Sequence, residues 1–205
     1  MVFKDSLSKF STVGAANTIF QWEDVIAGVG YKTFSALVNN EGAALITSSQ
    51  SSNDYKTDKN VNAEEEINFD YEFLAGADIG GEGYINITLR RAASDATVLC
   101  DVRLIHVDTA AAETELVATL TTDQLSGGAA TDSRRVSITM AIPETHFSIG
   151  EKIRLEIILK VTALGSGLGG IYHDPANRGT TGNDIITGSP ARTDLTLTIP
   201  FRLPV

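Results

Sequence analysis

The sequence has a single cysteine, Cys100, among 205 residues. One thiol cannot form an intramolecular disulfide, so the fold does not depend on oxidation. Cys100 alternates with Val98, Val102 and Leu104, which is typical of a strand with one buried face. We therefore predict a buried and inert thiol.

Long apolar runs are also missing. No window approaches the roughly 18 consecutive apolar residues of a membrane-spanning helix, so we expect no membrane span. Residues 1–6 lack a basic start followed by an apolar core, which argues against a cleaved signal peptide. The protein is expected to be made in a cytoplasm and, if it leaves, to leave by another route.

Basic residues are scarce, because 16 Lys and Arg stand against 26 Asp and Glu, for a formal net charge of -10. A nucleic-acid-binding surface needs clustered Lys and Arg, so we expect no nucleic-acid partner. An acidic surplus suits a soluble particle that must not stick to its own copies, and simple solubility is the alternative explanation.

The strongest pattern that the sequence does contain runs from Ile153 to Val161. Apolar residues occupy every second position there, with charged residues between them over much of the stretch. The same alternation recurs along the chain, and no segment has a comparably long helical pattern. We expect about ten strands in an all-β, antiparallel two-sheet sandwich that is jelly-roll-like. The expected strands are 31–37, 43–47, 66–73, 84–90, 98–107, 115–120, 136–142, 152–162, 171–173 and 195–203.

Two parts of the chain are distinguished. Residues 1–28 contain large apolar residues without a clean period and are expected to dock on the sandwich or on a neighbouring subunit. Residues 29–205 are expected to form a single β-sandwich domain. Polar residues 48–60 and the Gly-rich residues 75–83 are expected to be loops. Pro200 interrupts the last strand, which predicts that this strand lies at an edge or is irregular there.

No residue is predicted to be catalytic or to bind a cofactor. His106, His146 and His173 lie in different segments without metal-ligand spacing. The acidic run 64–66 precedes a strand, where neighbouring side chains point to opposite faces and do not share a site. We therefore expect that the chain is not an enzyme.

Residues 179–188 resemble one copy of the calcium-binding glycine-aspartate repeat of secreted bacterial toxins, with Thr180 in place of the second glycine. A single copy lacks the partner turn of a β-roll, so chance resemblance in a Gly-rich loop is the alternative. Oxygen ligands suit calcium, and the candidate ligands are Asp174, Asn177, Asn183 and Asp184.

Aromatic residues offer a different kind of site. Exposed aromatic rings on a β-sandwich can stack on sugars, although such residues commonly belong to the core or its rim. The candidates are Trp22, Tyr31, Tyr55, Tyr84 and Tyr172.

Three C-terminal segments, residues 147–155, 169–178 and 195–203, resemble parts of β-sandwich structural proteins of tailed archaeal and bacterial viruses. The resemblance is an overall pattern without a diagnostic motif. It implies a non-enzymatic virion component, such as a capsid decoration, turret or tail-associated protein. The implied partners are other copies in a symmetric homo-oligomer and other virion proteins. The alternative is a carbohydrate-binding module, with a host-surface glycan as a possible ligand and a possible loop-bound calcium.

Overall fold

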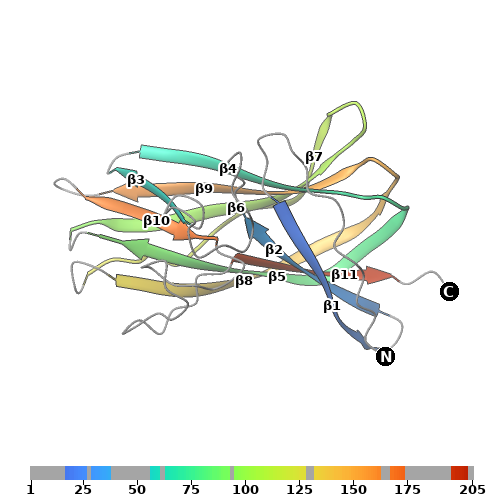
Figure 1. Ribbon diagram of the computed structural model, residues 1–205, viewed down its shortest axis with the longest axis horizontal. Coiled ribbons are helices and arrows are strands. Elements are labelled where there is room, and N and C mark those ends of the chain that lie inside the picture. Colours follow the sequence, from blue (N-terminus) through green and yellow to red (C-terminus); the bar gives the residue numbers. More distant parts are fainter. Residues whose placement is uncertain are drawn as a thin grey trace, which may run out of the picture.

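The computed structural model describes residues 17–26, 29–37, 56–60, 63–92, 95–127, 132–162, 167–173 and 195–202. These ranges form eleven strands and no helix, and the strands build two antiparallel sheets (Figure 1). The strands are β1 (Asn17–Ile26), β2 (Val29–Leu37), β3 (Lys56–Asn60), β4 (Ala63–Glu72), β5 (Ala77–Arg91), β6 (Thr97–Val107), β7 (Glu113–Thr121), β8 (Asp132–Phe147), β9 (Lys152–Thr162), β10 (Leu168–Tyr172) and β11 (Leu195–Arg202). The predicted all-β sandwich is confirmed. Within the described ranges there is no helix of the length and apolarity that crossing a membrane requires.

Eight of these strands have jelly-roll connectivity. The smaller sheet has the order β4-β9-β6-β7, and the larger sheet contains the order β3-β10-β5-β8. From β3 to β10 the chain changes sheet at every connection except the β6–β7 hairpin. This exchange between two sheets is the arrangement of a jelly roll.

Strand β5 is the centre of the larger sheet and has 15 residues. One of its edges pairs with β8 over nearly its whole length. Its other edge pairs first with β11 and then, beyond Asn86, with β10. Strands β2 and β1 continue the sheet outward from β11, so Asn17–Ile26 forms the outermost strand on that side.

The core lies between the two sheets, where the alternating apolar residues of the central strands meet. Ile85, Ile87 and Leu89 of β5 are fully buried, as are Ile157 and Leu159 of β9. Cys100 is also buried and free, so the prediction of a buried thiol is confirmed, and burial raises the pKa of this thiol.

Two segments expected to be loops contain strands. Lys56–Asn60 forms β3, and β5 already begins at Ala77 within the Gly-rich stretch. Strand β8 continues through Pro143 and bulges there, because Pro143 and Glu144 together stand opposite the single residue Gly80 of β5. A side chain at Gly80 would come within 2.9 Å of the backbone of Glu144, so glycine leaves room for this bulge.

The last strand is internal. β11 pairs with β2 on one side and with β5 on the other, so the expectation of a C-terminal edge strand is wrong. The alternative is confirmed, because the register between β11 and β5 shifts between Thr198 and Phe201, around Pro200.

Candidate functional site

Three connections meet at one end of the sandwich. They are residues 74–76 after β4, 108–112 between β6 and β7, and 148–151 between β8 and β9, and together we call them the loop tip. The amide of Phe73 donates to the carbonyl of Glu151, and the amide of Gly150 donates to the carbonyl of Phe73, both at 2.8 Å. Thr109 lies beside Gly150, because a Cβ added there would be 3.5 Å from its methyl carbon. The loop tip is thus one continuous surface.

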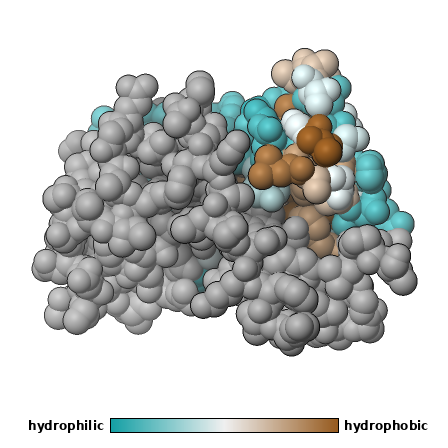
Figure 2. All heavy atoms as spheres, turned by 45° about the vertical axis from the view of Figure 1, so that its right-hand side comes forward, coloured by the Kyte–Doolittle hydropathy of each residue, from teal (hydrophilic) through white to brown (hydrophobic). Residues whose placement is uncertain are grey.

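Large apolar side chains are exposed on the loop tip. Leu74 is 56% exposed and Ile149 is 69% exposed, and the side chains of residues 110–112 are exposed alanines. Figure 2 shows hydrophobic side chains among hydrophilic ones on the described part of this end. Single exposed apolar residues are common, but two large ones beside an alanine loop form a small contact surface.

The backbone of the loop tip is held in place by Asp108. Its carboxylate oxygen Oδ1 accepts hydrogen bonds from the amides of Ala110 and Ala112, each at 2.8 Å. Ala111 between them has φ 64°, in the left-handed region that disfavours residues with a side chain. Strained backbone of this kind persists only where its surroundings fix it, and it often marks functional sites.

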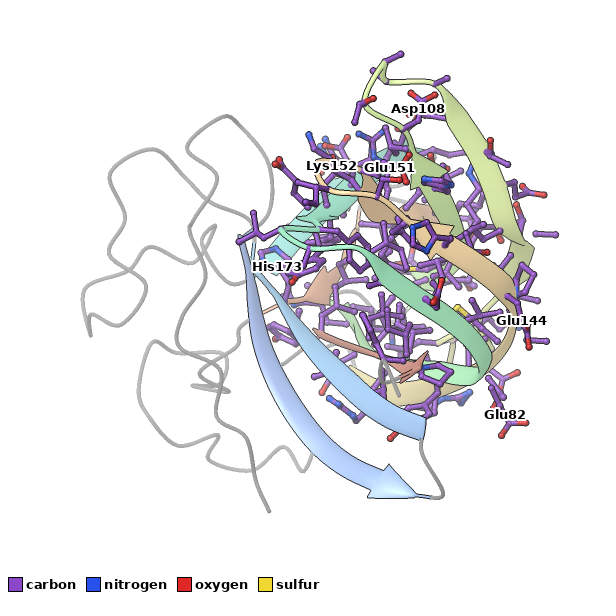
Figure 3. The ribbon with its side chains drawn as sticks, turned by 90° about the vertical axis from the view of Figure 1, so that its right-hand side faces the viewer. Glu82, Asp108, Glu144, Glu151, Lys152 and His173 are labelled. Carbon is purple, nitrogen blue, oxygen red and sulfur yellow. The ribbon has the colours of Figure 1, made fainter. Side chains whose placement is uncertain are left out.

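Glu151 fixes the neighbouring turn. Its carboxylate accepts a hydrogen bond from the amide of Ser148 at 2.8 Å and lies 2.9 Å from Nε2 of His106. The hydrogen bond from the Ser148 amide lowers the pKa of Glu151 below its ordinary value. The contact with His106 lowers this pKa further, and partial burial opposes both effects. The ring of His106 also packs on Phe147, with 4.4 Å between centroids. Figure 3 shows Asp108, Glu151 and Lys152 together at this end.

A second polar group lies beside the loop tip, on the first residues of β5 and the last of β8. Nδ1 of His146 is 2.7 Å from a carboxylate oxygen of Asp78, and both side chains are exposed. Figure 3 shows Glu82 and Glu144 at the same margin of the molecule. The described residues contain no group of three or more His, Cys, Asp or Glu that could hold a metal ion.

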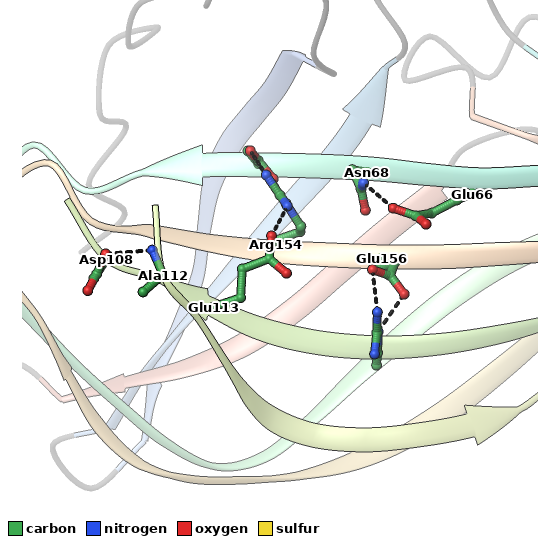
Figure 4. A network of polar contacts seen from close by, with 9 residues as sticks. Glu66, Asn68, Asp108, Ala112, Glu113, Arg154 and Glu156 are labelled. Carbon is green, nitrogen blue, oxygen red and sulfur yellow. Dashed lines mark hydrogen bonds and ion pairs between the residues drawn. The ribbon is translucent and has the colours of Figure 1, made fainter. Parts of the chain in front are cut away.

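The outer face of the smaller sheet carries a network of ion pairs (Figure 4). The guanidinium of Arg154 binds both carboxylate oxygens of Asp70, at 2.7 and 2.9 Å, and also contacts Glu113. Arg103 binds the buried carboxylate of Glu156 in the same bidentate way. These pairs join β4, β9, β6 and β7 across the sheet and stabilise it.

One further pair extends this network. Asp101 accepts hydrogen bonds from Lys160 at 2.6 Å and from the Thr121 hydroxyl at 2.6 Å. Burial opposes ionisation of Asp101, but these hydrogen bonds outweigh it and lower the pKa of its carboxyl.

The three histidines have separate neighbours. His106 lies against Glu151, His146 against Asp78, and the buried His173 against Phe69, with 6.3 Å between ring centroids. The acidic run 64–66 is divided between ion pairs and a side-chain hydrogen bond: Glu65 pairs with Lys59, Glu64 with Lys160, and Glu66 accepts from Asn68.

The predicted calcium ligands Asp174, Asn177, Asn183 and Asp184 lie outside the described residues, so the calcium site stays a prediction. The side chains of Trp22, Tyr31 and Tyr55 also lie outside the described part. Of the remaining aromatic candidates, Tyr84 is 39% exposed. Tyr172 is buried, with the guanidinium of Arg90 5.7 Å from its ring centroid.

Sequence reasoning did not identify the loop tip. Ile149 stands in the turn Ser148–Glu151, and an apolar residue in a turn is a weak signal of an exposed contact. Leu74 directly follows the alternating residues of β4 and looks like part of that pattern. Only the packing of three separate connections brings the two residues together.

No protein-family model and no curated protein sequence matches the chain. A CocE/NonD family hydrolase from Staphylococcus aureus is similar in structure at 13% identity and a TM-score of 0.44, over 71% of this chain and 33% of that one. An α-amino acid ester hydrolase is similar at 11% identity and a TM-score of 0.42, over 67% of this chain and 25% of that one. VP2 of infectious bursal disease virus, in a subviral particle, is similar at 15% identity and a TM-score of 0.34, over 87% of this chain and 39% of that one.

These similarities correct one prediction. We expected that the chain is not an enzyme, and that exclusion is wrong, because hydrolases stand among the similar structures together with the viral protein. The chain spans about a third of the length of the first hydrolase. Similarity at this level concerns the fold and assigns neither activity to this chain, because one fold serves many functions. No family match supports tailed-virus proteins in particular.

Proposed function

We propose that the protein is a structural subunit of a virus particle, such as a capsid decoration, turret or tail component. It assembles in several copies and binds other virion proteins. The observation that carries this proposal is the loop tip, where Leu74 and Ile149 are exposed on a backbone fixed by Asp108 and Glu151.

Such a surface suits protein contacts for energetic reasons. Covering a fully exposed Leu or Ile contributes about 1.5–3 kcal/mol, and these two retain more than half of their exposure. Loops that are already ordered lose little entropy when they bind. The ion-paired face of the smaller sheet, in contrast, is largely satisfied within the subunit, so we assign it a stabilising role.

The resemblance of residues 147–155 and 195–203 to virion proteins supports the same class. The first of these segments contains the 148–151 connection of the loop tip, between β8 and β9. The second contains β11, which is internal to the larger sheet.

The proposal is tested by measuring mass by light scattering over a range of protein concentrations. We expect the wild type to form a defined homo-oligomer and the double variant Leu74→Ser, Ile149→Ser to have a smaller mass. Leu168→Ser is the matched control, because Leu168 is 41% exposed at the far end of the sandwich, where its carbonyl accepts a hydrogen bond from the amide of Ala92.

Loss of assembly in the control as well would indicate general destabilisation and not a role of the loop tip. A wild type that remains monomeric at every concentration would contradict the proposed self-assembly.

A second candidate function, recognition of a host-surface glycan, is favoured by the surroundings of Tyr84. This exposed ring stands between Thr139 and Thr198 of the neighbouring strands. Beside it, Ser137 donates to Asn86 at 2.5 Å, and Asn86 donates to Thr196 at 3.2 Å. Neutral hydrogen-bonding groups around an aromatic ring match the chemistry of a neutral sugar.

A panel of neutral oligosaccharides (gluco-, manno- and chito-oligosaccharides) provides the test by calorimetry. We expect saturable binding that Tyr84→Ala abolishes and Tyr84→Phe retains. Absence of binding across the panel would refute this second candidate.

A further inference from the structure

Strand β8 lies at the border of the larger sheet (Figure 1). It has 16 residues and, within the described part of the chain, pairs with β5 alone. A long edge strand presents unpaired backbone amides and carbonyls, which can pair with another strand. Ser137, Thr139 and Ala141 are exposed, so the outer face of this strand is accessible to solvent.

Among the described residues, the middle of β8 carries none of the features that usually protect an edge strand. Residues 136–142, Val-Ser-Ile-Thr-Met-Ala-Ile, are uncharged and rich in strand-forming side chains. The devices that usually protect an edge, namely charges, proline and a bulge, occur only at the two ends of this segment. Arg134 and Arg135 precede it, and Pro143 and Glu144 follow it.

The charges at the two ends have opposite sign, which makes the strand complementary to itself. In an antiparallel pair of two copies centred on Thr139, Arg134 of each copy lies opposite Glu144 of the other. A parallel pair in register would instead place Arg134 against Arg134, which repels. Self-complementary surfaces of this kind form two-fold symmetric dimers.

We propose that β8 pairs with β8 of a second copy, antiparallel and two-fold symmetric about Thr139, so that the larger sheets of the two copies become continuous. This inference rests on the proposed function, because it adds a second contact between copies to the one at the loop tip. In this register Val136 lies opposite Ile142 of the other copy, and Ile138 lies opposite Met140.

The same register covers apolar surface. Val136 and Ile138 are only partly buried and pack against the core, while Met140 and Ile142 are buried. The apolar row on the inner face of one copy would therefore continue into the row of the other. On the outer face, Thr139 meets Thr139, and such cross-strand threonine pairs are favourable.

The test is the variant Thr139→Cys in the full chain. Residues directly opposite each other in an antiparallel pair have Cα atoms about 4.5–5.5 Å apart, within the range that a disulfide spans. Cys100 is fully buried and does not compete. We expect mild oxidation to convert Thr139→Cys almost completely into a covalent dimer.

Ser137→Cys is the matched control, because Ser137 is also exposed on the same face of β8. In the proposed register the two 137 positions lie about 13 Å apart along the strands, too far for a disulfide. Equal cross-linking of both variants, or none of Thr139→Cys, would overturn the proposed register. If the wild type still forms an oligomer in that case, the proposed function stands and only the β8 contact fails.

Charge exchange gives an independent measurement. Arg134→Glu and Glu144→Arg should each weaken the dimer by about tenfold, and the double variant should restore it. Arg134 also lies 3.8 Å from Asp123, but both side chains are well exposed, so losing that contact should change folding little. A double variant that dimerises no better than the single variants would contradict the pairing.

Discussion

Replacing Gly169 with alanine should destabilise the sandwich at the point where β10 packs against the opposite sheet. A Cβ at position 169 would lie 2.4 Å from a methyl carbon of Val98 and 2.9 Å from one of Val161. Both valines are buried, so neither methyl group can move into open space. Overpacking of this kind costs about 1–3 kcal/mol. For a domain of this size, a loss of 2 kcal/mol lowers Tm by about 4–8 °C.

Urea and thermal unfolding followed by circular dichroism measure this effect. Gly76→Ala is the control, because its Cβ would meet nothing closer than 3.7 Å, and its effect should stay within about 0.5 kcal/mol. Adding Val98→Ala to Gly169→Ala should cost less than Val98→Ala does alone, since the truncation removes the closest clash. A Gly169→Ala protein as stable as the wild type, without coupling to Val98, would refute this account of the packing.

Three other outcomes follow from particular residues. Ala111→Gly should stabilise the protein by about 1 kcal/mol in urea unfolding, because a left-handed residue with a Cβ costs about 1–2 kcal/mol; an unchanged midpoint would contradict the strained loop. Because folding lowers the pKa of Glu151, its carboxylate stabilises the fold above the unfolded-state pKa of about 4.3, and this contribution is lost as pH falls through the lower folded-state pKa. Glu151→Gln should therefore reduce the urea midpoint at pH 7 and differ little from the wild type at strongly acidic pH, and a constant difference would exclude this linkage. Cys100 should react with a thiol reagent only after unfolding, and rapid reaction of the native protein would show that the core opens.

Strands with one face in the core were predictable from sequence, because burial imposes a period of two. The expected strand 152–162 coincides with β9, and the expected strand 195–203 matches β11 over its described residues, Leu195–Arg202. In both strands, apolar residues occupy every second position and face the core, and the residues between them are mostly polar or charged. The sandwich class followed from the number and spacing of such segments.

Elements specified by distant partners were not predictable. Lys56–Asn60 has no apolar alternation, and its strand exists because its backbone pairs with β10. The early start of β5 depends on the bulge in β8, which accommodates Gly80 and lies more than 60 residues away in sequence.

The two candidate surfaces also depend on contacts between residues that are distant in sequence. In the loop tip, hydrogen bonds such as that of Gly150 to Phe73 join two of the connections, and Thr109 of the third lies beside Gly150. That β8 pairs with no described strand other than β5 follows from the assembled sheet and not from the sequence of β8. Neither feature has a local signature, whereas the calcium prediction for residues 174–184 came from a local motif and stays a prediction.

The central claim, that the chain assembles through the edge of β8, is tested most directly by hydrogen exchange of the wild type at low and high protein concentration. Alternate amides between Val136 and Ile142 already face β5 and should be protected at both concentrations. The amides between them should become protected only as the protein associates. If those amides exchange rapidly while light scattering shows an oligomer, the copies associate through another surface and the claim is contradicted.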